Sequence, residues 1–198
     1  MRRHEFIRVI AGTVAALPLT ARAQQPAKIY RIGLLTNGIV IGATNERRKT
    51  LVSMLAGQGF IEGQNLVFEE RSANAQPRRL DGLVAELKAG NVDVLVTFGY
   101  PPALAAKNLA GAIPVVVTGA GDPVATGLVD GLARPGGNLT GVTELSTDLS
   151  TKRLEILKDA LPGLQQVAML WNADDLGMTL RYQAAENAAR VLGVRYKL

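Results

Sequence analysis

The sequence has no cysteine and only one histidine, His4. Without cysteine the chain can form no disulfide and offers no thiol nucleophile. The usual zinc sites and the serine–histidine catalytic systems also depend on histidine or cysteine, and here the one histidine lies at the start of the chain. This composition leaves binding proteins, all-carboxylate metal sites and two-carboxylate hydrolases open.

Aromatic residues are also scarce, at 5%, whereas 47% of the residues are hydrophobic and 20% are charged. Such a balance is typical of a globular chain whose core is built from Val, Leu, Ile and Ala. A length of 198 residues suits one ordinary domain, or one domain and part of another.

The net charge of +5 suggests a nucleic-acid partner only until its position is considered. Residues 1–23 contain four of the 22 basic residues and one of the 17 acidic residues, which leaves 18 and 16 in residues 24–198. The resulting net charge of +2 is no basic footprint, so we expect no nucleic-acid partner.

Residues 1–23 have the three parts of a secretory signal peptide. Arg2, Arg3 and Arg8 form a positive start, residues 9–19 are modestly apolar, and Ala21-Arg22-Ala23 is a small-x-small cleavage site. The Arg2-Arg3 pair resembles a twin-arginine signal, with a general secretory signal or a retained anchor as alternatives. We therefore expect export to the periplasm and cleavage after Ala23.

After this segment, apolar strand patterns alternate with helical patterns. We expect strands at 30–36, 65–72, 92–99, 113–119, 138–143 and 166–172, and the start of another strand after 193. We expect helices at 45–59, 76–90, 101–112, 122–133, 149–163 and 178–194. The alternation predicts the α/β class, with a doubly wound parallel sheet.

Three of these helices have predicted inner faces. In the helix at 76–90 the apolar residues at helical spacing are Leu80, Leu83, Val84 and Leu87. Leu51, Met54 and Leu55 lie on one face of the first helix, after a possible cap at Asn45. In the helix at 149–163 we expect four leucines to point inward, namely Leu149, Leu154, Leu157 and Leu161.

Polar and small residues follow four of the predicted strands. They lie in the segments 36–38, 98–101, 118–122 and 172–175. In a parallel α/β sheet ligands bind at the carboxyl ends of the strands, so these segments could bind a small polar solute, with Tyr100 stacking on a flat part. Alternatively they are ordinary polar turns, and Asp174-Asp175 is a helix cap before Met178 rather than a carboxylate pair.

Nucleotide-binding motifs are absent. Gly119-Ala120-Gly121 lacks the third glycine of GxGxxG because Val124 occupies its position, and no GxxxxGK[ST] motif occurs. We therefore expect no cofactor and no metal.

Several segments together resemble one family. They are GFIEGQNLVFEER, PPALAAK, IPVVVTGAGDPVATGLVDGLARPGGNLTG and LSTDLSTKRLEILKDALPG. The chain resembles ABC transporter substrate-binding proteins of the tryptophan/tyrosine type. This resemblance implies a type I periplasmic-binding fold with two α/β lobes, no catalytic residues, and delivery of a small polar organic solute, such as an amino acid, to a membrane permease.

The resemblance also implies a domain division and a binding site. Residues 24–145 would form the N-terminal lobe and residues 146–198 part of the second lobe, in a monomer. The implied ligand-binding residues are Thr36, Asn37, Gly99, Tyr100, Thr118, Gly119, Asp122 and Asn172.

The chain departs from the family in two respects. Asn172 is followed by Ala173-Asp174-Asp175, where relatives often have an Asn-Pro step. Relatives also continue beyond residue 198, so we expect a truncated second lobe in which Leu170, Trp171 and Val194 lack cover.

Two alternative functions stay open at this point. The first is an extracellular ligand-sensing module with the same fold. The second is an exported α/β enzyme that uses Asp122 and Asp174 as paired carboxylates.

Overall fold

The computed structural model describes residues 28–38 and 42–197. The predicted signal peptide and its cleavage site therefore lie outside the described residues. The strands are β1 (Tyr30–Thr36), β2 (Leu66–Ser72), β3 (Val94–Phe98), β4 (Val115–Thr118), β5 (Leu139–Val142), β6 (Gln166–Ala168) and β7 (Arg195–Lys197). The helices are α2 (Glu46–Gly57), η1 (Pro77–Arg79, a 3₁₀ turn), α3 (Leu80–Ala89), α4 (Tyr100–Leu109), α5 (Ser146–Ala160) and α6 (Leu176–Val191).

The first five strands form one parallel sheet in the order β2-β1-β3-β4-β5. Leu34 in β1 is in register with Val96 in β3, and Val96 is in register with Val116 in β4. Each strand is followed by a connection that returns to the same end of the sheet, as a parallel sheet requires. The predicted α/β class and parallel sheet are confirmed.

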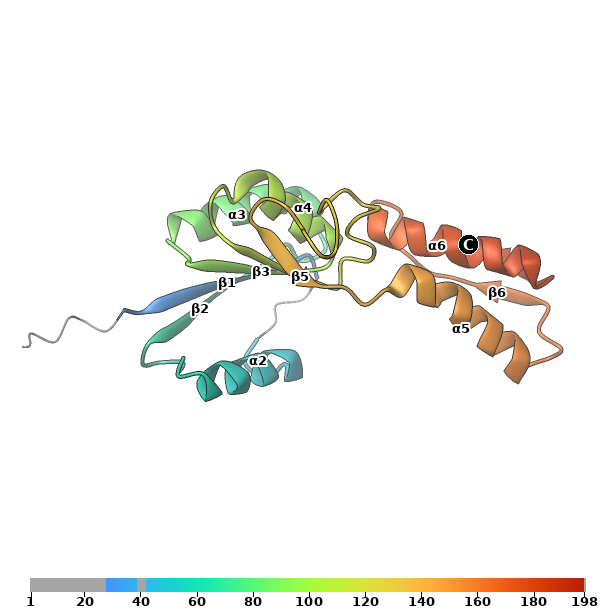
Figure 1. Ribbon diagram of the computed structural model, residues 1–198, viewed down its shortest axis with the longest axis horizontal. Coiled ribbons are helices and arrows are strands. Elements are labelled where there is room, and N and C mark those ends of the chain that lie inside the picture. Colours follow the sequence, from blue (N-terminus) through green and yellow to red (C-terminus); the bar gives the residue numbers. More distant parts are fainter. Residues whose placement is uncertain (1–27, 39–41, 198) are drawn as a thin grey trace, which may run out of the picture.

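The main core lies between this sheet and helices α3 and α4, which cover the same face (Figure 1). Leu35, Leu95 and Val115 point from the sheet toward this layer and are almost completely buried. Helix α3 contributes Leu83, Val84 and Leu87, at the spacing predicted from the sequence. The narrow alanine face of α4, which includes Ala103 and Ala106, lets that helix pack closely.

Helix α2 lies on the opposite side of the sheet (Figure 1) and has no buried residue. Its predicted cap is confirmed, because the Asn45 side chain accepts a hydrogen bond from the Arg47 N–H at 2.9 Å. The predicted inner face is wrong at Met54, which is 69% exposed, while Leu51 and Leu55 are half-buried.

The segment 122–133, predicted as a helix, forms turns instead. The Asp122 carboxylate accepts hydrogen bonds from the N–H groups of Val124 and Ala125, and Thr126 N–H donates to the Asp122 carbonyl. One helical turn thus forms and ends at Gly127, whose φ is +70°.

The remaining elements form a smaller unit, in which α5 and α6 pack together beside the two-stranded parallel sheet of β6 and β7 (Figure 1). Its core contains Leu154, Ala188, Ala189 and Val194. Three of the four leucines predicted to point inward from α5 are exposed, namely Leu149, Leu157 and Leu161.

The three residues predicted to lack cover differ from one another in burial. Leu170 is 99% exposed, Val194 is buried, and Trp171 is half-buried because it stacks on Tyr182 at 3.8 Å between ring centroids. The expectation is confirmed for Leu170 and wrong for Val194, because Val194, just before β7, packs in one buried cluster with Leu154 of α5 and Ala188 and Ala189 of α6.

Candidate functional site

A cavity of about 300 Å³ lies at the carboxyl ends of β1 and β3. Its wall consists of Thr36, Asn37, Gly38, Asn45, Arg47, Phe98, Gly99, Pro101 and Asp175. These residues come from the ends of two strands and from the beginnings of α2, α4 and α6. Parallel strands and their following helices bring such ends together, so the position agrees with the usual ligand site of an α/β sheet.

The loop after β1 supplies a buried side-chain oxygen, on Asn37, that accepts no hydrogen bond from the described residues. Thr36 is buried in the wall, and the adjacent Asn37 is half-buried. The Asn37 Oδ1 atom is buried and has no hydrogen-bond partner among the described residues. Burying such an acceptor is costly, so this oxygen is suited to accept a hydrogen bond from a bound molecule.

The end of β2 and the loop that follows it form hydrogen bonds to the backbone of this segment. Ala75 N–H donates to the Asn37 carbonyl at 2.6 Å, and the Ser72 hydroxyl donates to the Gly38 carbonyl. Asn74 and Ala75 both have positive φ values, of 51° and 59°, which cost conformational energy in residues other than glycine. These two hydrogen bonds, one from a backbone N–H and one from a hydroxyl, therefore fix the backbone at Asn37 and Gly38.

Gly99 forms the turn between β3 and α4. Its φ is +90°, a conformation that a side chain would disfavour, and its N–H donates to the Thr118 carbonyl at 2.9 Å. The proline pair Pro101-Pro102 then begins α4, a position in which the missing N–H groups cost nothing.

Asp175 is the one wall residue that comes from the smaller unit. Its carboxylate caps α6 by accepting the Met178 N–H at 3.0 Å, so the predicted helix cap is confirmed at Asp175. Burial raises the pKa of the Tyr100 hydroxyl, and the nearby negative charge of Asp175 raises it further.

Two glycines allow α6 to approach the larger unit this closely. A Cβ on Gly177 would lie 2.9 Å from the Ala120 carbonyl oxygen and 3.4 Å from the Tyr100 Cβ. A Cβ on Gly121 would lie 3.3 Å from the Gly177 Cα. Backbone therefore packs against backbone where the two units meet beside the cavity.

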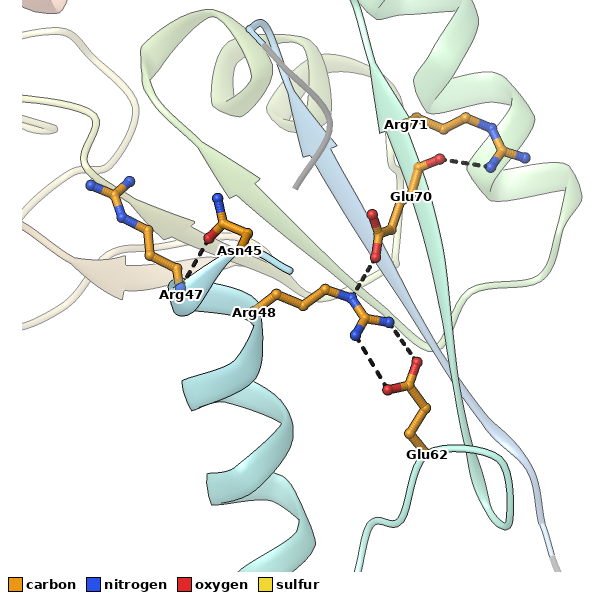
Figure 2. A network of polar contacts seen from close by, with 6 residues as sticks. All are labelled: Asn45, Arg47, Arg48, Glu62, Glu70 and Arg71. Carbon is orange, nitrogen blue, oxygen red and sulfur yellow. Dashed lines mark hydrogen bonds and ion pairs between the residues drawn. The ribbon is translucent and has the colours of Figure 1, made fainter. Parts of the chain in front are cut away.

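Among the described residues, the cavity wall carries one positive and one negative side chain, those of Arg47 and Asp175. Asn45 and Arg47 stand at the start of α2 (Figure 2), where free N–H groups and the helix dipole also favour negative charge. The site can thus offer a cation to an anionic group and a carboxylate to a cationic group.

The structure brings together three of the eight residues expected to bind ligand: Thr36, Asn37 and Gly99. Tyr100 is buried beneath the start of α6, next to the wall rather than in it. Thr118, Gly119, Asp122 and Asn172 lie outside the wall. The Asp122 carboxylate is engaged in its own turn, and the exposed Asn172 side chain accepts the Asp174 N–H at 3.1 Å.

Sequence reasoning did not assign Asn45 or Arg47 to the site. Phe98, Pro101 and Asp175 lie in the candidate segments 98–101 and 172–175 but were not among the eight residues that the resemblance implied. Asn45 was recognised only as a helix cap, although the same position that makes a cap also places a residue at the ligand edge of the sheet. Arg47 gave no signal, because an arginine on a predicted helix usually faces solvent.

A second cavity, of about 270 Å³, lies between β4, β5 and the loop 120–135. Its lining is largely apolar, includes Val117, Leu128 and Leu132, and contains no charged residue. We place the candidate site in the first cavity because its wall carries charged and amide side chains that can orient a polar solute.

Neither a metal centre nor a membrane-spanning helix is found in the part of the chain that the structure describes. Within residues 28–38 and 42–197 no group of three or more Asp, Glu, His or Cys residues could hold a metal ion. No described helix is long and apolar enough to cross a bilayer.

Comparison with known families gives a match to the model of ABC transporter substrate-binding proteins over residues 39–190, well over half of the chain. The chain belongs to this family. A tyrosine-binding protein from Clostridioides difficile (strain R20291) is 25% identical over 147 residues, which cover 74% of this chain and 42% of that protein.

Solved structures share the fold of this chain. A conserved domain protein from Vibrio cholerae is 27% identical, with a TM-score of 0.78 over 85% of this chain and 56% of that one. An ABC domain from Streptococcus pneumonia in complex with L-Trp is 19% identical, with a TM-score of 0.71 over 86% of this chain and 56% of that one. These neighbours have the type I periplasmic-binding fold, and the chain spans about half the length of the proteins it matches.

Proposed function

We propose that this chain is the exported solute-binding component of an ABC importer and that its cavity holds a small zwitterionic solute, an α-amino acid. The solute would be held between the sheet edge and the start of α6 and passed to a membrane permease. Family membership supports the transport role. The chemistry of the cavity wall supports the class of solute.

The observation that carries this proposal is the pair of opposite charges in the wall. The Arg47 guanidinium can bind a carboxylate with two parallel hydrogen bonds, and Asp175 can accept hydrogen bonds from an ammonium group. Asn37 Oδ1 supplies a further acceptor. A volume of about 300 Å³ lies at the small end of the range of ligand pockets, which suits a molecule of amino-acid size.

An aromatic amino acid is the preferred candidate. The tyrosine-binding relative supports this choice, and Phe98 and Pro101 give the wall an apolar part against which a ring can pack. Of the eight residues first expected to bind, Thr36, Asn37 and Gly99 remain candidates for direct contact, with Asn45, Arg47 and Asp175 added.

The remaining parts of the proposal rest on the sequence. The pattern of residues 1–23 supports export to the periplasm with cleavage after Ala23, and the small net charge beyond it supports the absence of a nucleic-acid partner. We propose that the protein acts as a monomer without cofactor or catalytic residue. The enzyme alternative has little support, because the Asp122 carboxylate is engaged in its own turn and Asp174 is exposed. No observation favours the sensing module.

Thermal unfolding with and without solutes tests the proposal. L-Tyrosine, L-tryptophan and the other amino acids are added singly to the full chain, with D-tyrosine as a control for the geometry of the site. A solute present at 100 times its Kd stabilises the folded state by about 2.7 kcal/mol, which raises the midpoint by several degrees. No shift with any amino acid would contradict the proposal.

The Asp175→Asn variant tests the ammonium site. Asparagine is as good a helix cap as aspartate, so we expect α6 and the unfolding midpoint to be nearly unchanged. Affinity for L-tyrosine should fall about tenfold or more through loss of a charge-assisted bond. Affinity for the analogue without the amino group, 3-(4-hydroxyphenyl)propionate, should not fall. Equal losses for both compounds would show that Asp175 does not contact an ammonium group.

A further inference from the structure

Arg48 is the most buried charged side chain on α2, although the helix itself has no buried residue. Its side chain is 10% exposed, and Figure 2 shows it pointing away from Arg47 toward β2. Placing a guanidinium there requires that its donors be satisfied. The cavity wall does not include Arg48.

The Arg48 guanidinium binds two carboxylates from different segments. It makes a two-pronged contact with Glu62, in the loop after α2, with Nη2–Oε1 at 2.5 Å and Nη1–Oε2 at 3.3 Å. Its Nε donates to Glu70 Oε1, on β2, at 2.5 Å. The guanidinium carbon lies 4.8 Å from the centre of the Phe68 ring, a cation–π contact two residues before Glu70 on the same face of β2.

These contacts fasten the first turn of α2 to the sheet. The far end of the helix is held differently, because Phe60 follows it and packs edge-on against Tyr30 of β1 at 5.1 Å between ring centroids. Because α2 has no fully buried residue, these two attachments help to fix its position, together with the half-buried Leu51 and Leu55. Hydrogen bonds to the Glu62 and Glu70 carboxylates raise the pKa of Arg48, so its guanidinium is charged throughout the physiological range.

We infer that Arg48 is a positioning residue for the solute site: by clasping Glu62 and Glu70 it holds the first turn of α2 so that Arg47 and Asn45 stand in the cavity wall. This inference rests on the proposed function. Neighbouring arginines on a helix point about 100° apart, so one can face the sheet while the other faces the cavity. The position of Arg47, which is exposed, is therefore set through the backbone that Arg48 anchors.

A double-mutant cycle on the full chain tests this inference, with affinity for L-tyrosine and L-tryptophan measured by calorimetry. Arg47→Gln and Arg48→Gln should each weaken binding about tenfold, because each removes the charged contact to the solute, one directly and one through misplacement. The combined variant should bind no more weakly than the worse single variant. A misplaced Arg47 no longer contacts the solute, so removing its charge costs no further affinity. Multiplied losses, or unchanged affinity in Arg48→Gln, would overturn the inference.

Arg71→Gln is the matched control. Arg71 follows Glu70 on β2 and pairs with Glu86 at 2.9 Å, but it does not line the cavity. This variant should keep full affinity. If it lost as much affinity as Arg48→Gln, the effect of Arg48→Gln would come from the change in net charge or in overall stability rather than from the position of α2. Glu62→Gln removes the charge of Glu62, the more exposed of the two carboxylates that bind Arg48. It should give an intermediate loss of affinity in a chain that folds normally.

Hydrogen exchange without solute separates the two proposals. In Arg48→Gln the amides of residues 46–57 should exchange faster, while those of β1 stay protected, and Arg71→Gln should change neither. Unchanged exchange in α2 would overturn the role of Arg48 in positioning. If the unmodified chain binds neither amino acid, the proposed function is wrong, and Arg48 then has no role in solute binding. Hydrogen exchange still shows in that case whether Arg48 holds α2 in place.

Discussion

At the scale of single residues, Asp93 shows how one carboxylate joins the beginnings of two strands. It accepts a hydrogen bond from the Arg31 N–H of β1 at 2.8 Å and forms an ion pair with Lys28 at 2.8 Å. Its own N–H donates to the Arg31 carbonyl just before β3 begins. The hydrogen bond from Lys28 and that from the Arg31 backbone lower the pKa of Asp93 below its ordinary value of 3.8.

Asp93→Ala should lower the free energy of unfolding by about 1–2 kcal/mol at pH 7 through loss of these hydrogen bonds. Because folding lowers the pKa, the ionised carboxylate stabilises the folded state above the unfolded value, and this contribution is lost as the pH falls through the lowered value. The difference from the unmodified chain should therefore narrow below pH 3.8 in urea titrations.

Asp93→Asn is the control, since an amide oxygen can still accept the Arg31 N–H but carries no charge. Its stability should lie between those of the other two chains at pH 7. A gap between Asp93→Ala and the unmodified chain that stays constant from pH 7 to pH 2.5 would show that the charge of Asp93 contributes nothing.

At the scale of elements, α5 shows which leucines a helical pattern can assign. Leu154 is 5% exposed and belongs to the core formed with α6 and β7, whereas Leu157 is 38% exposed. The pattern predicted both as inward, because a periodicity tells which residues share a stripe but not how wide the covering neighbour is. Only the packing of α6, whose alanine face approaches α5 closely, decides between them.

Leu154→Ala and Leu157→Ala form a matched pair on this helix. The first should cost about 2–4 kcal/mol, through lost burial and a cavity in a small core. The second should change stability by less than about 1 kcal/mol, because little apolar area is lost from the packed interior. Urea unfolding monitored by Trp171 fluorescence measures both, and equal costs would mean that Leu157 is covered in solution.

At the scale of the whole molecule, the important contact is the one between Gly121 and Gly177. It lets the start of α6 meet the loop after β4 backbone to backbone, and it brings Asp175 to the cavity wall. Tyr100 lies beneath this contact. The two units therefore line one cavity together only as long as they can approach to this distance.

Gly177→Ala should weaken solute binding about tenfold or more, because its Cβ would meet the Ala120 carbonyl at 2.9 Å and displace the residue that the wall takes from the smaller unit. Stability should fall only slightly, since alanine favours the helix itself. Calorimetric titration with L-tyrosine and a urea melt of the same variant measure the two effects.

Gly82→Ala provides the control, because Gly82 lies within α3 with nothing within 4 Å of an added Cβ. The same substitution there should raise stability by about 0.5–1 kcal/mol and leave binding unchanged. If Gly177→Ala also kept full affinity, the contact between the two units would have no part in binding.

The sequence by itself determined the fold class, the family and most of the elements, the helix expected at 122–133 being the exception. Buried strands such as 113–119 read as apolar runs, and Asn45 and Asp175 read as caps, because strand burial and helix starts depend on residues close in the chain. Local patterns also located the edge of the sheet, so Thr36, Asn37 and Gly99 were expected where the cavity lies.

Only the tertiary structure decided which of those edge residues share a cavity. Asp122 was expected there, but nearby backbone N–H groups bind its carboxylate, whereas Arg47 was overlooked because its place depends on how α2 is clasped to β2. Asp175 reaches the wall through two glycines 56 positions apart in the chain, Gly121 and Gly177. Distances of this kind are set by packing between separate elements, which no local pattern of residues encodes.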